Sequence, residues 1–402
     1  MYKVERLLVR MIYTYARLSG VLNFEIDTAT GQPRTTRRAS LYAAFANVLL
    51  FSVLPMGYSS GLLDILWNRV GFLHEYVILM VLGLRISCVC VTLLSRWWQR
   101  ERHMRLVNEF RQLILEHPEV ISFWRRGLIL KFISVSGMEI GQIIVGLLSV
   151  RAAFSFSLVV ILLMLSTMTA LLNIFITHFF FGLLNIHGHY VLLNRSLRSV
   201  MAQTRALESE QRHGSFMSKC CSLADQLEDI ALRQCRLQAL THSMMRVFEL
   251  QLFCIWIAYY MSNVGGIYFA VLNHRVPTFV TTWLILLSGA QMLFYIMDTT
   301  ITTNMMYQVL DDHAELQAQL AERTLFRPGL DQRLEAVYES FQLQLARNPL
   351  RLNVLHFFDI KRSAVISMAS SMITNSIVLI QYDIKYDELK NSYLGVLDQK
   401  QD

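Results

Sequence analysis

Charged residues are scarce in this chain. They make up 17% of its 402 residues, whereas soluble domains usually carry about 25%. The shortfall is concentrated in long apolar blocks, and the mean hydropathy is +0.38. Long apolar blocks are typical of helices that meet lipid, so the composition favours an integral membrane protein.

Proline and glycine are also too few, at 6 and 18 residues, to form a low-complexity linker, and no internal repeat is present. The first apolar stretch, residues 7–22, contains Arg10 and Arg17 and lacks a convincing cleavage site. It therefore does not predict a cleavable signal peptide. We expect an amphipathic helix that lies against the cytoplasmic side of the membrane.

Motifs that carry chemistry are missing as well. The sequence has no nucleophile elbow, no phosphate-binding loop and no pair of carboxylates at a usable spacing. His187 and His189 do not share a helix face, and no cysteine or carboxylate completes a metal-ligand set with them. The net charge of +7 comes from residues between apolar blocks, where they signal topology. We expect no enzymatic activity, no cofactor, no metal and no nucleic-acid partner.

Seven windows are long and apolar enough to cross a hydrocarbon core of roughly 30 Å. They predict an all-α, polytopic membrane protein with seven transmembrane helices. The fourth window is longer than a crossing requires, so we expect its helix to continue into the following loop. The windows lie at 40–62, 75–96, 127–150, 153–183, 247–272, 277–298 and 362–384.

Lysine and arginine in the connections indicate the orientation. Residues 1–39 hold seven of them, whereas the first connection between helices holds only Arg69. Rich and poor connections then alternate along the whole chain, which predicts a multi-pass membrane protein with a cytoplasmic N-terminus. All six cysteines fall in helices or inner loops, where disulfides are not expected. The inner connections are long, and 202–240 and 314–345 show helical periodicity, so we expect them to form long helices that pack together in the cytoplasm.

The seventh window carries a stripe of polar residues. Ser367, Ser371, Thr374, Val378 and Gln381 stay within an arc of roughly 80° at 100° per residue. Such a face is costly against lipid, so it must meet protein or water. Two interpretations remain open: small-residue packing between helices, or the lining of an aqueous path in which Val378 is the one apolar step.

The same segment resembles a known family signature. Thr374 to Tyr382 is similar to the Thr-Tyr, apolar run, Gln-Phe signature of insect gustatory receptors. The stretch 355–363 resembles the segment before that helix in the family. Asn375 stands where the signature has Tyr, Tyr382 stands where it has Phe, and the polar Ser376 opens the apolar run.

The resemblance implies a gustatory chemoreceptor that is a tetrameric, ligand-gated, non-selective cation channel. Its subunits would be identical copies or include other gustatory receptors, and lipid and a small-molecule tastant would be its other partners. Carried over by position, Ser371, Thr374, Val378, Gln381 and Tyr382 would belong to the pore and gate. Sugar receptors of the family often carry an acidic residue where this chain has Ser376, so the resemblance favours a bitter or other non-sugar ligand.

These expectations divide the chain into five parts. A cytoplasmic segment is followed by six transmembrane helices with an outer ligand pocket, by cytoplasmic anchor helices, by the pore-lining helix and by an extracellular tail. The boundaries are 1–39, 40–300, 301–361, 362–384 and 385–402.

The ligand pocket is expected among aromatic side chains in the outer halves of helices two to six. Trp256, Tyr259, Tyr260 and Asn263 lie near one helix face by their spacing. Trp283 and Glu139 complete the candidate set. The alternative is that these residues only pack between helices or form an interfacial belt.

Three charges lie inside the predicted spans. Lys131 is near the inner end of its helix and is expected to snorkel. Arg85 and Glu139 fall near mid-depth, where an unpaired charge is expensive, so they are expected to pair with each other or to face the ligand.

Two other functions fit seven helices. A G-protein-coupled receptor requires the opposite orientation and usually an outer cysteine pair, which this sequence lacks. A secondary transporter commonly shows internal repeats and helices broken by Gly or Pro, and neither is evident.

The charge alternation makes a testable prediction. A tag at the N-terminus should be detected only after cells are permeabilised, whereas a tag after Asp402 should be detected on intact cells. Immunofluorescence with and without detergent measures both. Staining of the N-terminal tag on intact cells would refute the orientation and favour the G-protein-coupled alternative.

Overall fold

A computed structural model describes residues 3–27, 30–53, 72–152, 156–207, 213–273, 279–322, 331–354, 358–359 and 362–398. Nearly all of these residues are helical, which confirms the predicted all-α fold. The helices are α1 (Lys3–Leu18), α2 (Arg37–Val53), α4 (Phe72–Trp98), α5 (Arg100–Glu116), the 3-10 turn η2 (Pro118–Val120), α6 (Ile121–Ala152), α7 (Phe156–Ala206), α8 (His213–Asn273), α9 (Phe279–Ala321), α10 (Gln332–Arg347) and α11 (Arg362–Asp398). Two small antiparallel hairpins pair β1 (Glu25–Ile26) with β2 (Pro33–Arg34), and β3 (Asn353–Val354) with β4 (Phe358–Asp359).

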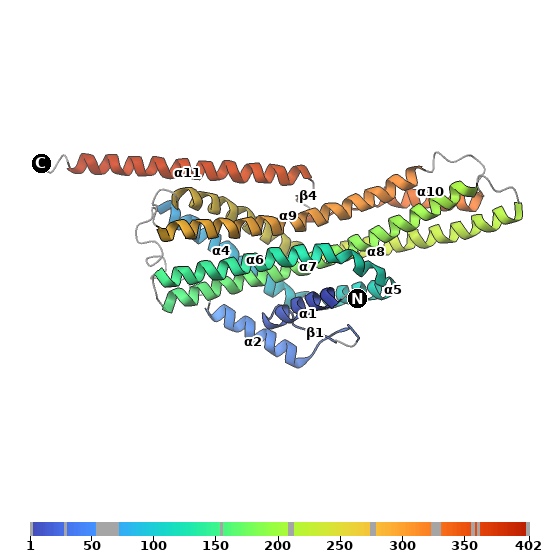
Figure 1. Ribbon diagram of the computed structural model, residues 1–402, viewed down its shortest axis with the longest axis horizontal. Coiled ribbons are helices and arrows are strands. Elements are labelled where there is room, and N and C mark those ends of the chain that lie inside the picture. Colours follow the sequence, from blue (N-terminus) through green and yellow to red (C-terminus); the bar gives the residue numbers. More distant parts are fainter. Residues whose placement is uncertain are drawn as a thin grey trace.

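The helices form a bundle and a long arm (Figure 1). The bundle contains α2, α4, α6, α11 and the apolar sections of α7, α8 and α9. The last three helices continue past the bundle and, with α10, make up the arm. Figure 1 shows α11 along one side of the bundle, with its first turn at the end nearer the arm.

The predicted spans correspond to helices where the structure describes them. Five helices, α4, α6, α7, α8 and α11, are long and apolar enough to cross a membrane in the part of the chain described. The fourth window continues as expected, since α7 runs on to Ala206. Of the first window, α2 covers residues up to Val53, and the rest lies outside the described residues. The helix of the seventh window extends to Asp398, so residues 385–398 are helical.

The arm has an apolar core of its own. Leu227, Leu316 and Leu334 are buried between helices that are far apart in sequence. Tyr338 of α10 is also fully buried, and its hydroxyl lies 3.1 Å from that of Thr204 on α7. These contacts join the arm into one body and match the predicted packing of long helices.

The N-terminal helix α1 lies against the bundle near the arm (Figure 1). Leu8 and Ala16 face the protein, while Leu7 and Leu18 are 59% and 63% exposed. This helix is thus amphipathic, as its sequence predicts, with apolar residues left over to meet a membrane interface.

A buried ion pair joins α6 to α9, and it corrects one expectation. Lys131 does not snorkel: its Nζ lies 2.7 Å from Asp298 Oδ2, and the two side chains are 2% and 4% exposed. Lys131 also donates to the hydroxyl of Thr302 at 3.0 Å, and Ser134 donates to Asp298 Oδ1 at 2.7 Å. A lysine this far from either helix end needs an anion close by, because a lone charge in the interior is costly. Asp298 is the last residue of the predicted sixth span, where a charge is expected to reach water. The sequence therefore does not identify it as the partner of Lys131.

Of the two alternatives for Arg85 and Glu139, pairing with each other is wrong, and the alternative that one of them faces the ligand stays a prediction. Glu139 accepts hydrogen bonds from the hydroxyl of Tyr15 at 3.0 Å and from the amide of Asn173 at 3.3 Å, and it forms no ion pair with Arg85 in the described part of the chain. Neutral donors from two other helices take the place of the arginine.

Replacing Asp298 with Ala should destabilise the protein severely, because it leaves the Lys131 ammonium buried without a counter-charge, at a cost of about 3–5 kcal/mol. Thermal unfolding in detergent, followed by fluorescence-detected size exclusion, measures the loss. The double variant Lys131→Met/Asp298→Leu should recover most of the stability, since it removes both charges at similar volume. An equally unstable double variant would show that packing at this site matters and the charge balance does not.

Candidate functional site

One narrow face holds α11 to the rest of the chain. Among the side chains of α11 that the structure describes, up to residue 386, those of Met372, Ser376 and Asp383 are buried, and they lie within one arc of the helix. The hydroxyl of Ser376 is fully buried and donates to the carbonyl of Val264 on α8 at 3.3 Å and to that of Met372 at 2.7 Å. The contact is therefore a close approach of α11 to the backbone of α8.

The polar stripe lies on the opposite side of α11. By the 100° rotation per residue, its centre is roughly 160° from the buried face. All five stripe residues are exposed, namely Ser367, Ser371, Thr374, Val378 and Gln381. Val378 is 55% exposed and its neighbour Tyr382 is 61% exposed. The stripe is thus largely uncovered by its own subunit in the described residues, and packing against a second subunit or lining water are the two interpretations left.

A second contact between α8 and α11 is polar. The hydroxyl of Tyr260 lies 2.8 Å from that of Ser371. The side-chain amide of Asn375 donates to the Tyr260 hydroxyl and, at 3.3 Å, to the Ser371 hydroxyl. Asn375, which departs from the family signature, therefore belongs to a hydrogen-bond network that ties one edge of the stripe to α8.

The first turn of α11 is held by α9. Arg362 forms an ion pair with Asp311 at 2.6 Å, and its guanidinium lies over the ring of Tyr307. Both charged side chains are more than 60% exposed, so the pair contributes roughly 1 kcal/mol or less. The base of α11 is consequently attached to α9 and its middle to α8.

A cavity of about 280 Å³ lies between these attachments. Its walls come from α8, from α9 and from the first turns of α11, with Ile176 of α7 at one side. The rings of Tyr259 and Tyr295 stack at a centroid distance of 5.1 Å in one wall. None of the described residues that line it is charged, and its polar side-chain groups are hydroxyls, one amide and the indole N–H of Trp256. This lining suits a small uncharged organic molecule.

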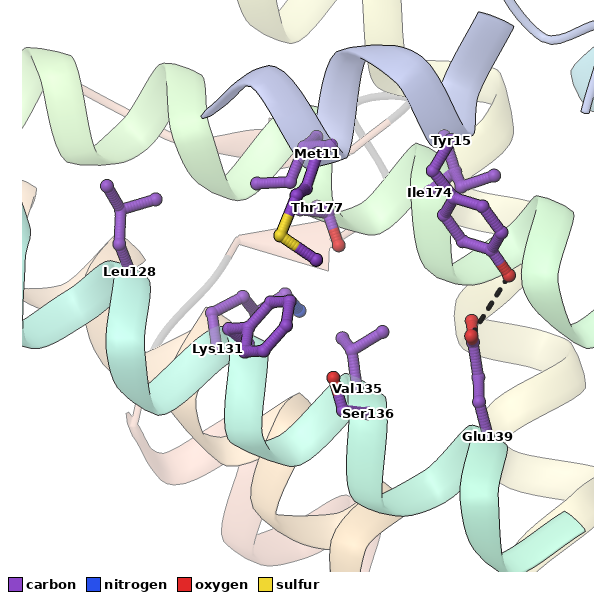
Figure 2. A pocket seen from close by; sticks show the side chains of 11 residues that line it. Met11, Tyr15, Leu128, Lys131, Val135, Ser136, Glu139, Ile174 and Thr177 are labelled. Carbon is purple, nitrogen blue, oxygen red and sulfur yellow. Dashed lines mark hydrogen bonds between the residues drawn. The ribbon is translucent and has the colours of Figure 1, made fainter. Parts of the chain in front are cut away.

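The structure separates the predicted ligand residues. Trp256 and Tyr259 line this cavity, whereas Tyr260 turns to α11. Asn263 is 4% exposed and donates to the carbonyl of Tyr259, so its amide is satisfied within α8. The side chain of Trp283 lies outside the described residues. Glu139 lies elsewhere, beside a second cavity between α1, α6 and α7 (Figure 2).

This cavity is not the outer pocket that the sequence predicts. That pocket is expected at the end of the bundle with short connections, away from the arm, where several residues lie outside the described ones, so it stays a prediction. Thr299, Thr303 and Tyr307 line the cavity where α9 leaves the bundle, which is the half nearer the arm. Helical spacing identifies which residues share a face of a helix. It does not identify where along the helix axis the neighbouring helices leave a cavity.

Sequence reasoning missed several lining residues. Thr299, Thr302 and Thr303 follow the predicted sixth span, and Met368 and Met372 lie on α11 away from the stripe. The run of threonines directly after the predicted span 277–298 is the sequence feature that could have identified them.

Comparison with known proteins identifies relatives along almost the whole chain. The sequence profile of the family described as 7tm Chemosensory receptor matches residues 9–386. Gustatory receptor 59d, as assigned in Drosophila melanogaster, is 35% identical over 384 residues, which cover 94% of this chain and 98% of the relative. Gustatory receptor 36b of the same organism is 35% identical over 387 residues, with the same coverage.

Solved structures show the same fold. The insect olfactory receptor OR5 from Machilis hrabei aligns with a TM-score of 0.66 at 13% identity, covering 94% of this chain and 99% of that one. Its complex with eugenol aligns with a TM-score of 0.58. All these relatives are receptors, which confirms that the chain is not an enzyme.

Tyr260→Phe should loosen the middle of α11, because it removes a hydroxyl that bonds both Ser371 and Asn375. At about 1 kcal/mol per hydrogen bond, backbone amides near residue 371 should exchange about five times faster or more. Hydrogen–deuterium exchange of the detergent-solubilised protein measures this. Tyr259→Phe is the matched control, since Tyr259 faces the cavity, and it should leave these amides unchanged. Equal exchange in the two variants would contradict a role of the network in holding α11.

Proposed function

The chain belongs to the seven-transmembrane chemosensory receptor family, and we propose that it is a gustatory receptor working as a ligand-gated, non-selective cation channel. Four subunits surround one pore, and α11 of each subunit lines it. The exposed stripe opposite the α8 contact carries this proposal. A hydroxyl and amide face on an apolar helix, turned away from its own subunit, needs water or equivalent faces of other subunits.

Association follows from the same face. Ile366, Ile373 and Ile377 lie beside the stripe and are 71%, 55% and 48% exposed. In a ring of α11 helices, the isoleucines meet neighbouring subunits or lipid while the stripe turns to the axis. The number four comes from the family resemblance, and the need to associate comes from the uncovered polar face. The assembly consists of identical copies or includes other gustatory receptor subunits.

The gate is placed at Val378. It is the apolar member of the stripe, so four copies form a constriction that excludes water in the closed state. Gln381 lies about one turn further along, and Thr374 about one turn before. Opening moves the four helices apart, so that amide and hydroxyl groups replace the valine ring as the lining.

The ligand is proposed to be a small organic molecule. A solved relative is described in complex with eugenol, a small aromatic compound. The uncharged cavity beside Trp256 and Tyr259 offers a site of suitable chemistry, and its wall includes Met368 and Met372 of α11. A molecule there touches the pore helix between its two attachments, so occupancy changes the balance between closed and open arrangements.

A non-sugar tastant, such as a bitter compound, is the proposed class. The family's sugar receptors often carry an acidic residue at the position of Ser376. Here that side chain is fully buried against α8, and a carboxylate in its place would be buried against a backbone carbonyl. The contact between α11 and α8 in this chain therefore requires a small side chain that can donate a hydrogen bond, such as the hydroxyl of Ser376.

The proposed cellular arrangement is a plasma-membrane protein with a cytoplasmic N-terminus. The arm then extends into the cytoplasm as an anchor domain. A G-protein-coupled receptor or a secondary transporter would require another use of the exposed stripe, and no contact in the described residues favours either.

Val378→Ser should raise the basal cation current, because a hydroxyl lets water enter the constriction. Gln381→Leu should reduce conduction, since it lengthens the apolar step by about one turn. Single-channel recording, normalised to surface protein, measures both and needs no known ligand.

Trp256→Ala is the control for this pair. It changes the cavity but not the stripe, so it should alter ligand sensitivity and leave the current through each open channel unchanged. Packing between helices predicts another result for Val378 and Gln381: less surface protein, with unchanged current per channel and unchanged basal current. That result would refute α11 as the pore helix.

A further inference from the structure

The cavity beneath α1 differs in charge from the one beside α11. It measures about 290 Å³ and is lined by α1, α6 and α7 (Figure 2). Met11, Leu128, Phe132 and Ile174 supply apolar walls. Figure 2 shows Glu139 and Tyr15 joined by a hydrogen bond at one end. A small site with an apolar body and one polar end suits a ligand of matching polarity.

The charge at that end is negative and is not balanced by a cation. Within the described residues, Glu139 is bonded by the neutral hydroxyl of Tyr15 and the neutral amide of Asn173. Lys131 also lines the cavity, but its ammonium is already paired with Asp298 in the wall. The lysine and aspartate together contribute no net charge, so Glu139 makes the net charge of the cavity lining negative.

Tyr15 cannot neutralise this carboxylate. Burial raises the pKa of the Tyr15 phenol, and the nearby charge of Glu139 raises it further. The phenol therefore keeps its proton and acts only as a hydrogen-bond donor. A carboxylate in a largely apolar setting is stabilised much more by a cation than by neutral donors.

We propose that this cavity is a second ligand site, which binds a small amphiphilic amine. The ammonium pairs with Glu139, and the apolar part lies against Met11, Leu128 and Phe132. An alkylammonium, like that of lysine with a pKa of about 10.4, stays charged at neutral pH. The ammonium takes a place beside Tyr15 or displaces its hydroxyl from the carboxylate.

The site also connects to α1. Met11, Ile12 and Tyr15 of α1 line the cavity, and the Tyr15–Glu139 hydrogen bond joins α1 to the middle of α6. An amine bound here fills the space between an amphipathic helix at the membrane interface and the bundle. This site is separate from the uncharged cavity beside α11, so its occupancy does not depend on the channel proposal.

The test measures binding directly. Hexylamine is titrated onto the full-length protein in nanodiscs made only of phosphatidylcholine, with isothermal titration calorimetry as the readout, and hexanol serves as the uncharged probe of the same shape. The native protein should bind hexylamine and bind hexanol at least about ten times more weakly. Glu139→Gln keeps an acceptor for Tyr15 and Asn173 but removes the charge, so it should bind hexylamine at least about ten times more weakly.

Two further variants make the result specific. Tyr15→Phe removes a competing donor and should bind hexylamine at least as tightly as the native protein. Glu101→Gln removes an exposed carboxylate of α5 and should bind like the native protein. The proposal is overturned if Glu139→Gln binds hexylamine as the native protein does, or if hexanol binds as tightly as hexylamine.

A lipid could present the same ammonium chemistry. Repeating the titration in nanodiscs that contain phosphatidylethanolamine distinguishes the sources. If phosphatidylethanolamine weakens hexylamine binding to the native protein but not to Glu139→Gln, the site binds the lipid headgroup. If the hexylamine affinity of the native protein is unchanged by this lipid, the site binds a free amine. Competition that persists in Glu139→Gln shows that the amine binds the lipid surface, which contradicts the site.

Discussion

The rest of this structure depends on one constraint: a polar group inside the bundle needs a partner, because lipid offers none. Lys131 and Asp298 satisfy each other between α6 and α9, with Ser134 and Thr302 completing the set. Ser376 satisfies its hydroxyl on the backbone of α8 and thereby fixes how closely α11 approaches. These contacts are specific in direction, so they set the rotation of each helix more sharply than apolar packing does.

Two polar features of the described residues are only partly satisfied inside the subunit. One is the stripe of α11, which faces away from its own subunit and so requires an assembly or water. The other is Glu139, which has neutral donors beside a cavity but no cation in the described residues. Each departure from the constraint marks a surface where something outside the subunit completes the structure. The uncharged cavity beside Trp256 is the contrasting case, since its walls need no charged partner.

The position of α11 brings it into contact with both the bundle and the base of the arm. Its base is tied to α9 at the start of the arm, and its middle is tied to α8 through Ser376 and the Tyr260 network. It has few buried side chains, so little apolar burial opposes a change in its tilt. A helix held at two points, with a cavity between them, can respond to small changes in the volume of that cavity.

The sequence by itself determined the class of fold, the continuation of the fourth span and the polar stripe, because apolar length and helical periodicity are local properties. It also determined the family, since the signature in 374–382 survives the changes at Asn375 and Tyr382. Only the tertiary structure decided the partners of the buried charges and the depth of the cavities. Spacing cannot reveal that Asp298 meets Lys131, or that Tyr15 and Asn173 meet Glu139, since these contacts join helices far apart in sequence. The direction of the stripe was likewise undecided until the opposite face of α11 was found against α8.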